Sequence, residues 1–165
     1  MMNAASILPL SLNNVSFEAG NKRLIKEFSH QFEAGPRTII LGPNGAGKSL
    51  LLRICHGLLA PTQGSVDWHM KDNPGRHQAM VVQRPVMLRR SVSANIDYAL
   101  SLQNIHITER RARTIDVLER TGLTSFANEP ARVLSFGEQQ KLALARAWAL
   151  KPQVLFLDEP TASLD

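Results

Sequence analysis

Apolar and polar residues alternate along the first part of the chain, and this alternation predicts β-strands. Residues 10–17 and 24–32 show it most clearly, and glycines follow them at Gly20 and Gly35. A period of two, bounded by turn-forming residues, is typical of antiparallel strands that bury one face. We therefore expect the chain to begin with an antiparallel pair of strands.

Two later runs are apolar without alternation: Arg37-Thr-Ile-Ile-Leu41 and Gln153-Val-Leu-Phe-Leu-Asp158. Continuous apolar runs predict buried strands, and we expect the second of these to be a strand of a parallel sheet. Residues 64–68 and 78–82 predict further strands, because the polar segment 71–75 separates them. The strands together predict a mixed sheet with a buried parallel part.

Apolar residues at helical spacing predict four helices. The first follows Lys48 and ends at Gly57, and the last covers residues 138–150. Between them, Ser93 is placed to cap a short helix that continues to Leu102. The chain should therefore alternate between strands and helices, as an α/β protein does.

A longer helix is expected to follow, beginning and ending at recognisable residues. Thr108 is placed to cap it, and Gly122 to end it. Its apolar face is expected to contain Ala112, Ile115 and Leu118. The two central helices would then form a helical insertion between the strands.

Composition excludes several classes of protein. The chain has 165 residues, a formal net charge of +5 and a single cysteine, Cys55, which excludes an intramolecular disulfide and fits a reducing compartment. Its basic residues are scattered and lack interleaved aromatic residues, so we expect no nucleic-acid partner. No apolar run approaches the length of a membrane span, and no signal peptide is recognisable.

The strongest chemical motif is a glycine-rich stretch that matches G-x-x-x-x-G-K-[ST]. Its glycines let backbone N–H groups approach phosphates closely, and its lysine reaches the outer phosphates. The stretch lies between a predicted strand and a predicted helix, which separates it from an ordinary glycine-rich turn with an exposed lysine. The predicted nucleotide-binding residues are Gly42, Pro43, Asn44, Gly45, Ala46, Gly47, Lys48 and Ser49.

Two later stretches, Leu134-Ser-Phe-Gly-Glu-Gln-Gln140 and Leu155-Phe-Leu-Asp-Glu-Pro160, follow in a fixed order. With the first motif, they resemble the signature and Walker B segments of ABC-type ATPases over nearly the whole chain. The segments 83–92 and 145–152 look like those of tungstate- and molybdate-type import ATPases. The transported solute does not touch such a subunit, so this last likeness is a weak guide to it.

The resemblance implies a fold and a division of the chain. The fold would be α/β, with a P-loop NTPase core containing a mixed, partly parallel sheet, N-terminal antiparallel strands and a helical insertion. Residues 1–83 would form the β region and P-loop core, and residues 84–137 a helical subdomain that ends in the signature. Residues 138–165 would return to the core, making one incomplete ABC ATPase domain.

The resemblance also implies ATP and Mg²⁺ as cofactors and assigns roles to residues. Ser49, Gln83 and Asp158 would hold the metal, and Gln83 would also touch the attacking water. Glu159 would be the catalytic base or water-orienting group. Signature residues would contact the ATP of a second subunit, and these are Ser135, Phe136, Gly137 and Glu138.

The implied function is the ATP-hydrolysing subunit of an importer on the cytoplasmic face of the membrane. Its partners would be a second ATPase subunit in a head-to-tail dimer, a transmembrane permease and, indirectly, a solute-binding protein. The alternative is a truncated or degenerate module that binds ATP with little or no hydrolysis. An ABC ATPase of DNA repair or translation is disfavoured because it would normally have a second ATPase half or a long coiled-coil insertion. A small-molecule kinase is disfavoured because it has no use for the stretch Leu134–Gln140.

Several residues depart from the family pattern. Phe136 replaces a glycine, and a left-handed backbone there would cost about 1–2 kcal/mol. Ala19 lies where an adenine-stacking aromatic ring is usual, and Leu50 replaces a second hydroxyl. No histidine follows Asp158, so a switch histidine is missing and residues 160–165 would be the family's D-loop. We expect a fragment with exposed apolar surface.

Overall fold

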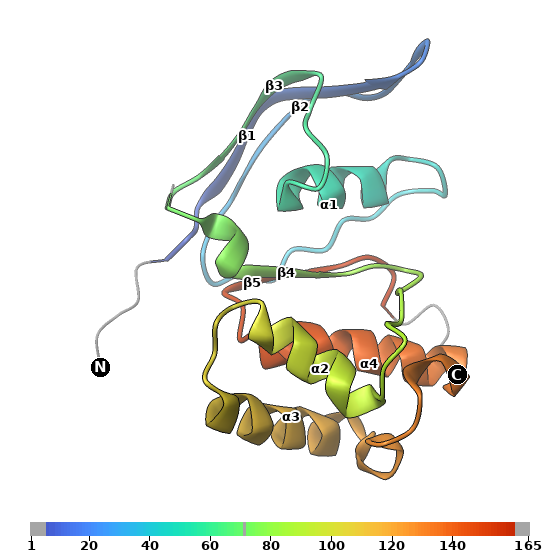
Figure 1. Cartoon of the computed structure of the whole chain (residues 1–165). Helices are drawn as coiled ribbons and strands as arrows, with labels where there is room; N and C mark the ends of the chain where they lie inside the picture. The colour runs from blue at the N-terminus through green and yellow to red at the C-terminus, as the bar shows by residue number, and fades with distance from the viewer. Residues whose placement is uncertain (1–5, 71, 161–165) are drawn as a thin grey trace. The chain divides into compact units, whose positions relative to one another are not determined.

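The structure is a computed structural model that describes residues 6–70 and 72–160 (Figure 1). The chain forms two compact units, Met1–Gln78 and Ala79–Asp165. We call them the N-terminal unit and the C-terminal unit, and each is described by itself. The predicted D-loop residues 161–165 lie outside the described part of the chain.

A three-stranded antiparallel sheet is the framework of the N-terminal unit. It consists of β1 (Leu10–Ala19), β2 (Lys22–Phe32) and β3 (Gln63–Trp68), in the order β2-β1-β3. The predicted N-terminal pair is therefore confirmed, and β1 is its central strand. Leu10, Leu12 and Val15 of β1 are buried, which accounts for the alternation in the sequence.

The predicted helix after the glycine-rich loop is confirmed as α1 (Lys48–His56). Gly57 ends it with a φ of 85°, and the Gly57 N–H donates to the Ile54 carbonyl at 3.0 Å. A left-handed residue at this position is what glycine supplies at helix ends. A short 3₁₀ helix, Pro74–Arg76, completes the unit before β4.

The run of residues 37–41 was expected to be a buried strand, and this prediction is wrong. The structure assigns no strand there, and Ile39 and Leu41 are 79% and 87% exposed. A β-branched run becomes a strand only when another strand supplies ladder partners, and none of the described strands pairs with it.

The C-terminal unit consists of a two-stranded sheet and three helices. Strands β4 (Gln78–Val81) and β5 (Val154–Leu157) pair with each other. Figure 1 shows the three helices together on one side of this pair. They are α2 (Val92–Ser101), α3 (Ile107–Thr121) and α4 (Phe136–Ala149), with short 3₁₀ helices at Thr124–Phe126 and Ala131–Val133.

The core of this unit lies where the three helices meet. Val92, Ile96 and Leu100 of α2 pack in one cluster with Leu118 of α3 and Leu142 of α4. These residues are at most 4% exposed. Since a buried apolar side chain contributes about 1.5–3 kcal/mol, this cluster fixes the helices relative to one another.

Two predicted helix starts are shifted in the structure. Ser91 rather than Ser93 caps α2, because its side chain accepts a hydrogen bond from the Ala94 N–H. His106 rather than Thr108 caps α3, and its ring accepts from the Thr108 N–H. The predicted ends, near Leu102 and at Gly122, are confirmed.

The buried face of α3 also differs from the prediction. Thr114, Val117 and Leu118 are buried, whereas Ala112 and Ile115 are exposed. Both Thr114 and Ile115 lie one turn before Leu118 and flank it on the helix surface. The spacing of apolar residues did not decide which of these two neighbouring faces is buried. In the structure, the face with Thr114 packs against α2 and α4.

Strand β5 is not buried on both faces, contrary to the prediction. Phe156 is 9% exposed, whereas Leu155 and Leu157 are 37% and 41% exposed. Successive side chains of a strand point to opposite faces, so one face of β5 is covered and the other is open. No helix in the described part of the chain is long and apolar enough to cross a membrane.

Candidate functional site

The glycine-rich loop of the N-terminal unit folds into a tight turn that leads into α1. The Ala46 N–H donates to the Pro43 carbonyl at 3.2 Å, and the Leu51 N–H donates to the Gly47 carbonyl at 2.8 Å. Gly47 precedes the helix with a φ of 90°, and a Cβ there would lie 3.3 Å from the Leu24 carbonyl oxygen. Glycine is therefore needed at 47 for both conformation and space.

Backbone donors of this loop are available to a ligand. Within the described residues, the N–H groups of Asn44, Gly45 and Gly47 donate to no protein acceptor. They precede the N-terminus of α1, where the helix dipole contributes about half a positive charge. Unused N–H donors at a positive helix end are a suitable site for phosphate groups.

The loop's lysine folds back onto the loop itself. Lys48 Nζ donates to the Gly42 carbonyl at 2.9 Å and to the Pro43 carbonyl at 3.0 Å. Two loop carbonyls thus hold the ammonium beside the same N–H groups. Beside it lies a cavity of about 280 Å³ whose walls include Phe28, Leu41 and Gly47. An anionic group entering the loop would meet this lysine without any long movement of the side chain.

Two adjacent carboxylates end β5 in the C-terminal unit. The Asp158 N–H donates to the Val81 carbonyl at 2.9 Å, which continues the pairing of β4 with β5. The Asp158 side chain is buried, whereas Glu159 is exposed and has a φ of 49°. A left-handed conformation in a residue other than glycine costs about 1–3 kcal/mol and is often found at functional sites.

The structure brings together two residues that the sequence places 76 positions apart. Gln83 Nε2 donates to Glu159 Oε2 at 2.6 Å. The amide of a third residue reaches the same place, since Gln140 Nε2 donates to the Gln83 carbonyl at 2.7 Å. The predicted catalytic pair is therefore joined by a direct hydrogen bond, and α4 contacts it through Gln140.

The segment after Gln83 has no regular secondary structure, and side chains bind its backbone. Arg146 of α4 donates to the Val86 carbonyl at 3.0 Å, and Arg132 donates to the Met87 carbonyl at 3.5 Å. Partial burial lowers the pKa of the Arg146 guanidinium from its ordinary value. The buried Asn95 donates to the Ser91 carbonyl at 2.9 Å and accepts from the Leu88 N–H at 3.1 Å.

The signature residues lie at the start of α4. Ser135 is the N-cap, and its N–H and hydroxyl both donate to Glu138 Oε2, at 2.8 and 2.7 Å. The hydrogen bonds from Ser135 lower the pKa of the Glu138 carboxyl. Sequence patterns of this kind predict a capping box, in which serine and glutamate satisfy one another's backbone donors.

The expected strain at Phe136 is absent. Phe136 is the first residue of α4, and its φ is not positive. The residue is 44% exposed. The helix supplies an ordinary right-handed conformation at this position, so the glycine of the family pattern is not required by the backbone here.

The predicted site residues fall into two groups. Residues 42–49 lie in the N-terminal unit, and Gln83, the signature residues, Asp158 and Glu159 lie in the C-terminal unit. Within the described residues, no group of three histidine, cysteine, aspartate or glutamate side chains gathers to bind a metal. Gln140, Arg132 and Arg146 were not predicted from the sequence, because their partners are backbone carbonyls that no side-chain pattern reveals.

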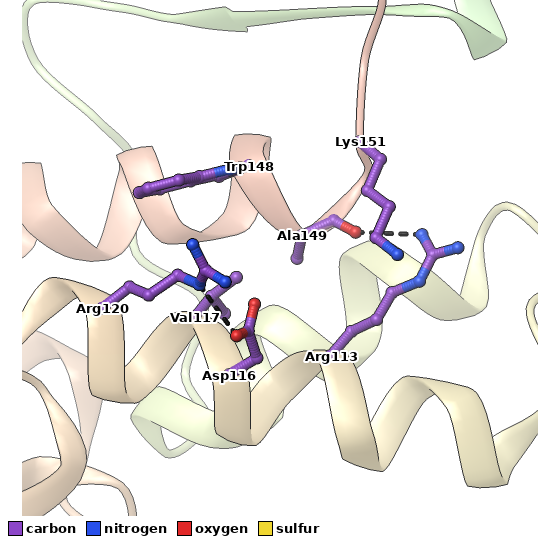
Figure 2. Close-up of a pocket in the computed structure, with 7 residues that line it drawn as sticks. All are labelled: Arg113, Asp116, Val117, Arg120, Trp148, Ala149 and Lys151. Atoms are coloured by element: carbon purple, nitrogen blue, oxygen red, sulfur yellow. Dashed lines mark hydrogen bonds and ion pairs between the residues drawn. The ribbon is translucent and has the colours of Figure 1, made fainter.

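A second cavity, of about 160 Å³, lies between α3 and α4 (Figure 2). Arg120 lies over the Trp148 ring at 5.6 Å and forms an ion pair with Asp116 at 2.8 Å. Arg113 donates to the Ala149 carbonyl at 3.0 Å. None of the residues predicted to act on a nucleotide lines this cavity, and the Arg113 and Arg120 guanidinium groups are engaged with partners in the same unit.

Comparison with protein families gives one match that covers most of the chain. The model of a family described as "ABC transporter" matches residues 25–162. This span contains all three motifs and every predicted site residue.

Curated relatives carry names of import subunits. The tungstate uptake system ATP-binding protein TupC of Peptoclostridium acidaminophilum is 38% identical over 160 residues, which cover 96% of this chain and 75% of that protein. The taurine import ATP-binding protein TauB of Pseudomonas aeruginosa is 35% identical over 157 residues, covering 92% of this chain and 60% of that protein. The chain thus spans only part of the length of either relative.

A solved structure supports the fold. It is a dimeric ATP-binding cassette in a post-hydrolysis state, bound to ADP and Pi. It is 29% identical to this chain, with a TM-score of 0.84, and the match covers 94% of this chain and 76% of that one. A mixed α/β ATP-binding cassette is therefore the fold that the two units share with known proteins.

Proposed function

The chain belongs to the ABC transporter family, whose ATP-binding domains are ATPases coupled to transport, and from this premise we propose that it is the ATP-hydrolysing subunit of an importer. The observation that carries the hydrolysis is the 2.6 Å hydrogen bond between Gln83 and Glu159, beside the buried Asp158. A module that only bound ATP would have no use for an amide placed against a strained, exposed glutamate.

ATP binding is assigned to residues 42–49. The unused N–H groups of the loop would surround the phosphates, and Lys48 would exchange its two carbonyl partners for phosphate oxygens. The exchange favours the phosphates because their oxygens carry negative charge, so the ammonium gains a Coulomb attraction that a neutral carbonyl does not provide. Asn44 contributes its unused N–H, whereas Pro43 and Ala46 shape the turn through the hydrogen bond from the Ala46 N–H to the Pro43 carbonyl.

A Mg²⁺ ion is proposed with Ser49, Gln83 and Asp158 as its protein ligands. A hydroxyl, an amide oxygen and a carboxylate are the hard oxygen donors that this ion takes, usually with water and phosphate oxygens completing the shell. When bound, the ion neutralises charge on the phosphates.

Glu159 is assigned to the attacking water. Gln83 binds only one of its carboxylate oxygens in the structure, which leaves the other to accept a hydrogen bond from water. Accepting that proton orients the water and raises its nucleophilicity, a contribution of about 10²–10⁴ for a positioned general base. Gln83 would fix the carboxylate in the required direction while this happens.

Ser135, Phe136, Gly137 and Glu138 are assigned to the ATP held by a second subunit. They form the first turn of α4, whose N-terminal dipole and N–H groups suit a terminal phosphate. The dimeric cassette among the solved relatives supports such a partner. The membrane permease and a solute-binding protein complete the proposed complex, on the cytoplasmic face of the membrane.

The solute is proposed only as a small imported one, with a tungstate-type oxyanion as the first candidate. The tungstate relative supports it, and the taurine relative at similar identity shows how little the ATPase sequence restricts the choice. Solute specificity belongs to other subunits. Co-expression with a permease and a solute-binding protein, followed by uptake of tungstate against taurine, would decide between them.

The function is tested by steady-state phosphate release. The chain as given is assayed with ATP and Mg²⁺, with EDTA in place of Mg²⁺, and as the Glu159→Gln variant. Turnover above both backgrounds is expected. Turnover equal to that of Glu159→Gln, with ATP binding retained, would instead assign the chain to the non-hydrolysing nucleotide-binding modules.

A further inference from the structure

Residues 83–88 include Gln83, a predicted catalytic residue, and their backbone forms no helix or sheet hydrogen bonds that would fix its position. They belong to no helix or strand. Their carbonyls are bound instead by the side chains of Gln140, Arg146 and Arg132, at Gln83, Val86 and Met87. Since side chains rather than neighbouring strands fix this segment, the residue that binds at Gln83 determines where the Gln83 side chain points.

The hydrogen bond at Gln83 is the shortest of these three. Gln140 is 3% exposed, and its Nε2 lies 2.7 Å from the Gln83 carbonyl oxygen. On the other side of the same residue, Gln83 Nε2 lies 2.6 Å from Glu159 Oε2. The three residues form a continuous chain, from α4 through the Gln83 backbone to the carboxylate.

The side-chain oxygen of Gln140 makes no hydrogen bond in the described residues, so its contact with the Gln83 carbonyl is not part of a larger polar network. Its Oε1 is buried and accepts no hydrogen bond within the described residues. An unsatisfied buried acceptor costs about 1–3 kcal/mol. A leucine would avoid that cost but would leave the Gln83 carbonyl without its donor, so the hydrogen bond to Gln83 is what the amide provides here.

We propose that Gln140 is a positioning residue for hydrolysis: by binding the Gln83 carbonyl, it holds the Gln83 side chain against Glu159. The inference rests on the proposed function of Glu159. Gln140 lies on α4, whose first turn carries the signature residues, so a displacement of that helix is passed through Gln83 to the carboxylate. Gln140 itself touches neither nucleotide nor water.

The experiment compares Gln140→Leu with a matched control, Gln78→Leu. Gln78 is 6% exposed, donates to the His56 carbonyl at 3.1 Å and also has a buried Oε1 without a hydrogen-bond partner in the described residues. The two substitutions therefore remove the same groups from similar environments. Only one of them touches Gln83.

Gln140→Leu is expected to lower kcat about tenfold and to leave the KM for ATP unchanged, because misplacing a reacting group by 1 Å can cost about 100-fold. Gln78→Leu should change neither. In a Gln83→Ala background, which keeps the carbonyl but removes the amide, Gln140→Leu should have no further effect on kcat. A merely structural role would give the same loss in both backgrounds, since independent effects add, and would overturn the proposal.

A second measurement does not depend on turnover. The side-chain amide signal of Gln83 in a ¹⁵N NMR spectrum is identified by its loss in Gln83→Ala. It should shift in Gln140→Leu and in Glu159→Gln, and stay in place in Gln78→Leu. If the chain releases no phosphate, the proposed function fails, and this signal alone decides the inference: an unmoved Gln83 amide in Gln140→Leu overturns it.

Discussion

The two units build their sites in opposite ways. In the N-terminal unit the site is a stretch of eight consecutive residues, 42–49, whose donors are mostly backbone N–H groups held by a turn and a helix start. In the C-terminal unit the proposed site includes Gln83, Gln140 and Glu159, which are far apart in the sequence and meet through side-chain hydrogen bonds. The proposed binding site is thus formed locally in the chain, whereas the proposed arrangement for hydrolysis depends on tertiary contacts.

The largest expected effect separates these two properties. Lys48→Ala should weaken ATP binding about 100-fold, since it removes charge-assisted hydrogen bonds that together contribute about 3 kcal/mol. Glu159→Gln should leave binding within about twofold and lower kcat by about 10²–10⁴. Calorimetric titration with a non-hydrolysable ATP analogue measures the first, and phosphate release the second.

The distinction between a binding site and a hydrolysis site would fail if Lys48→Ala and Glu159→Gln had the same defect. A Glu159→Gln variant that lost ATP binding would mean that the binding site extends into the C-terminal unit's carboxylates. A Lys48→Ala variant with normal binding would remove residues 42–49 from the site altogether. Circular dichroism of both variants checks that the fold is retained.

A smaller effect is expected from the loop backbone. Gly47→Ala places a Cβ 3.3 Å from the Leu24 carbonyl oxygen at a residue whose φ is 90°. The strain costs about 1–2 kcal/mol, and ATP affinity should fall about tenfold as the N–H donors shift. Gly75→Ala is the matched control, because Gly75 has no positive φ and no atom within 4 Å of the added carbon.

Normal ATP affinity in Gly47→Ala would contradict the view that the loop backbone is held in its binding geometry before ATP arrives. It would show that the loop's backbone reorganises around phosphate and that the geometry seen here is not the binding geometry. Thermal unfolding of the two glycine variants separates lost stability from lost affinity.

The same contrast explains what the sequence could predict. The antiparallel pair and α1 are local patterns, and both were predicted correctly, whereas the assignment of residues 42–49 to nucleotide binding stays a prediction. Motifs indicated Gln83 and Glu159 separately, but neither the hydrogen bond between them nor the capping box at the start of α4 was predicted. Residues 37–41 were predicted wrongly because a strand requires a partner strand, and the sequence of the run itself does not contain one. Gln140 was overlooked because its acceptor is a backbone carbonyl.

The N-terminal unit also contains a buried thiol whose pKa gives a pH-dependent prediction. Burial raises the pKa of Cys55 in α1 from an ordinary value of 9.0 to about 12. The group is neutral in the folded chain and ionises on unfolding above pH 9, so its contribution to stability is full below pH 9 and falls as the pH rises toward 12. The advantage of wild type over Cys55→Ala should shrink by up to about 1.4 kcal/mol per pH unit in that window.

Urea unfolding of wild type and Cys55→Ala at pH 7, 9 and 10 measures this change. Its direction is decisive, because other groups titrate equally in both proteins and cancel in the difference. An advantage that grows with pH would mean that the thiol is ionised in the folded chain, and α1 would then have a different environment from the one described.

The smallest effect is expected at the start of α4, where the C-terminal unit depends on a side-chain cap rather than on a glycine. Ser135→Ala should cost about 1 kcal/mol, the usual loss for a serine N-cap.

The cap also has a pH dependence, because the hydrogen bonds from Ser135 lower the pKa of Glu138. A lowered folded pKa means that this contribution is present above the ordinary glutamate value and is lost as the pH falls through the folded value. Wild type and Ser135→Ala should therefore differ in stability at pH 7 and converge in acid, as urea unfolding at the two pH values would measure. A difference that persists in acid would mean that the serine hydroxyl caps the helix without the Glu138 carboxylate. The start of α4 would then depend on contacts within one short stretch of chain and on no ionised side chain, as the loop of the N-terminal unit does.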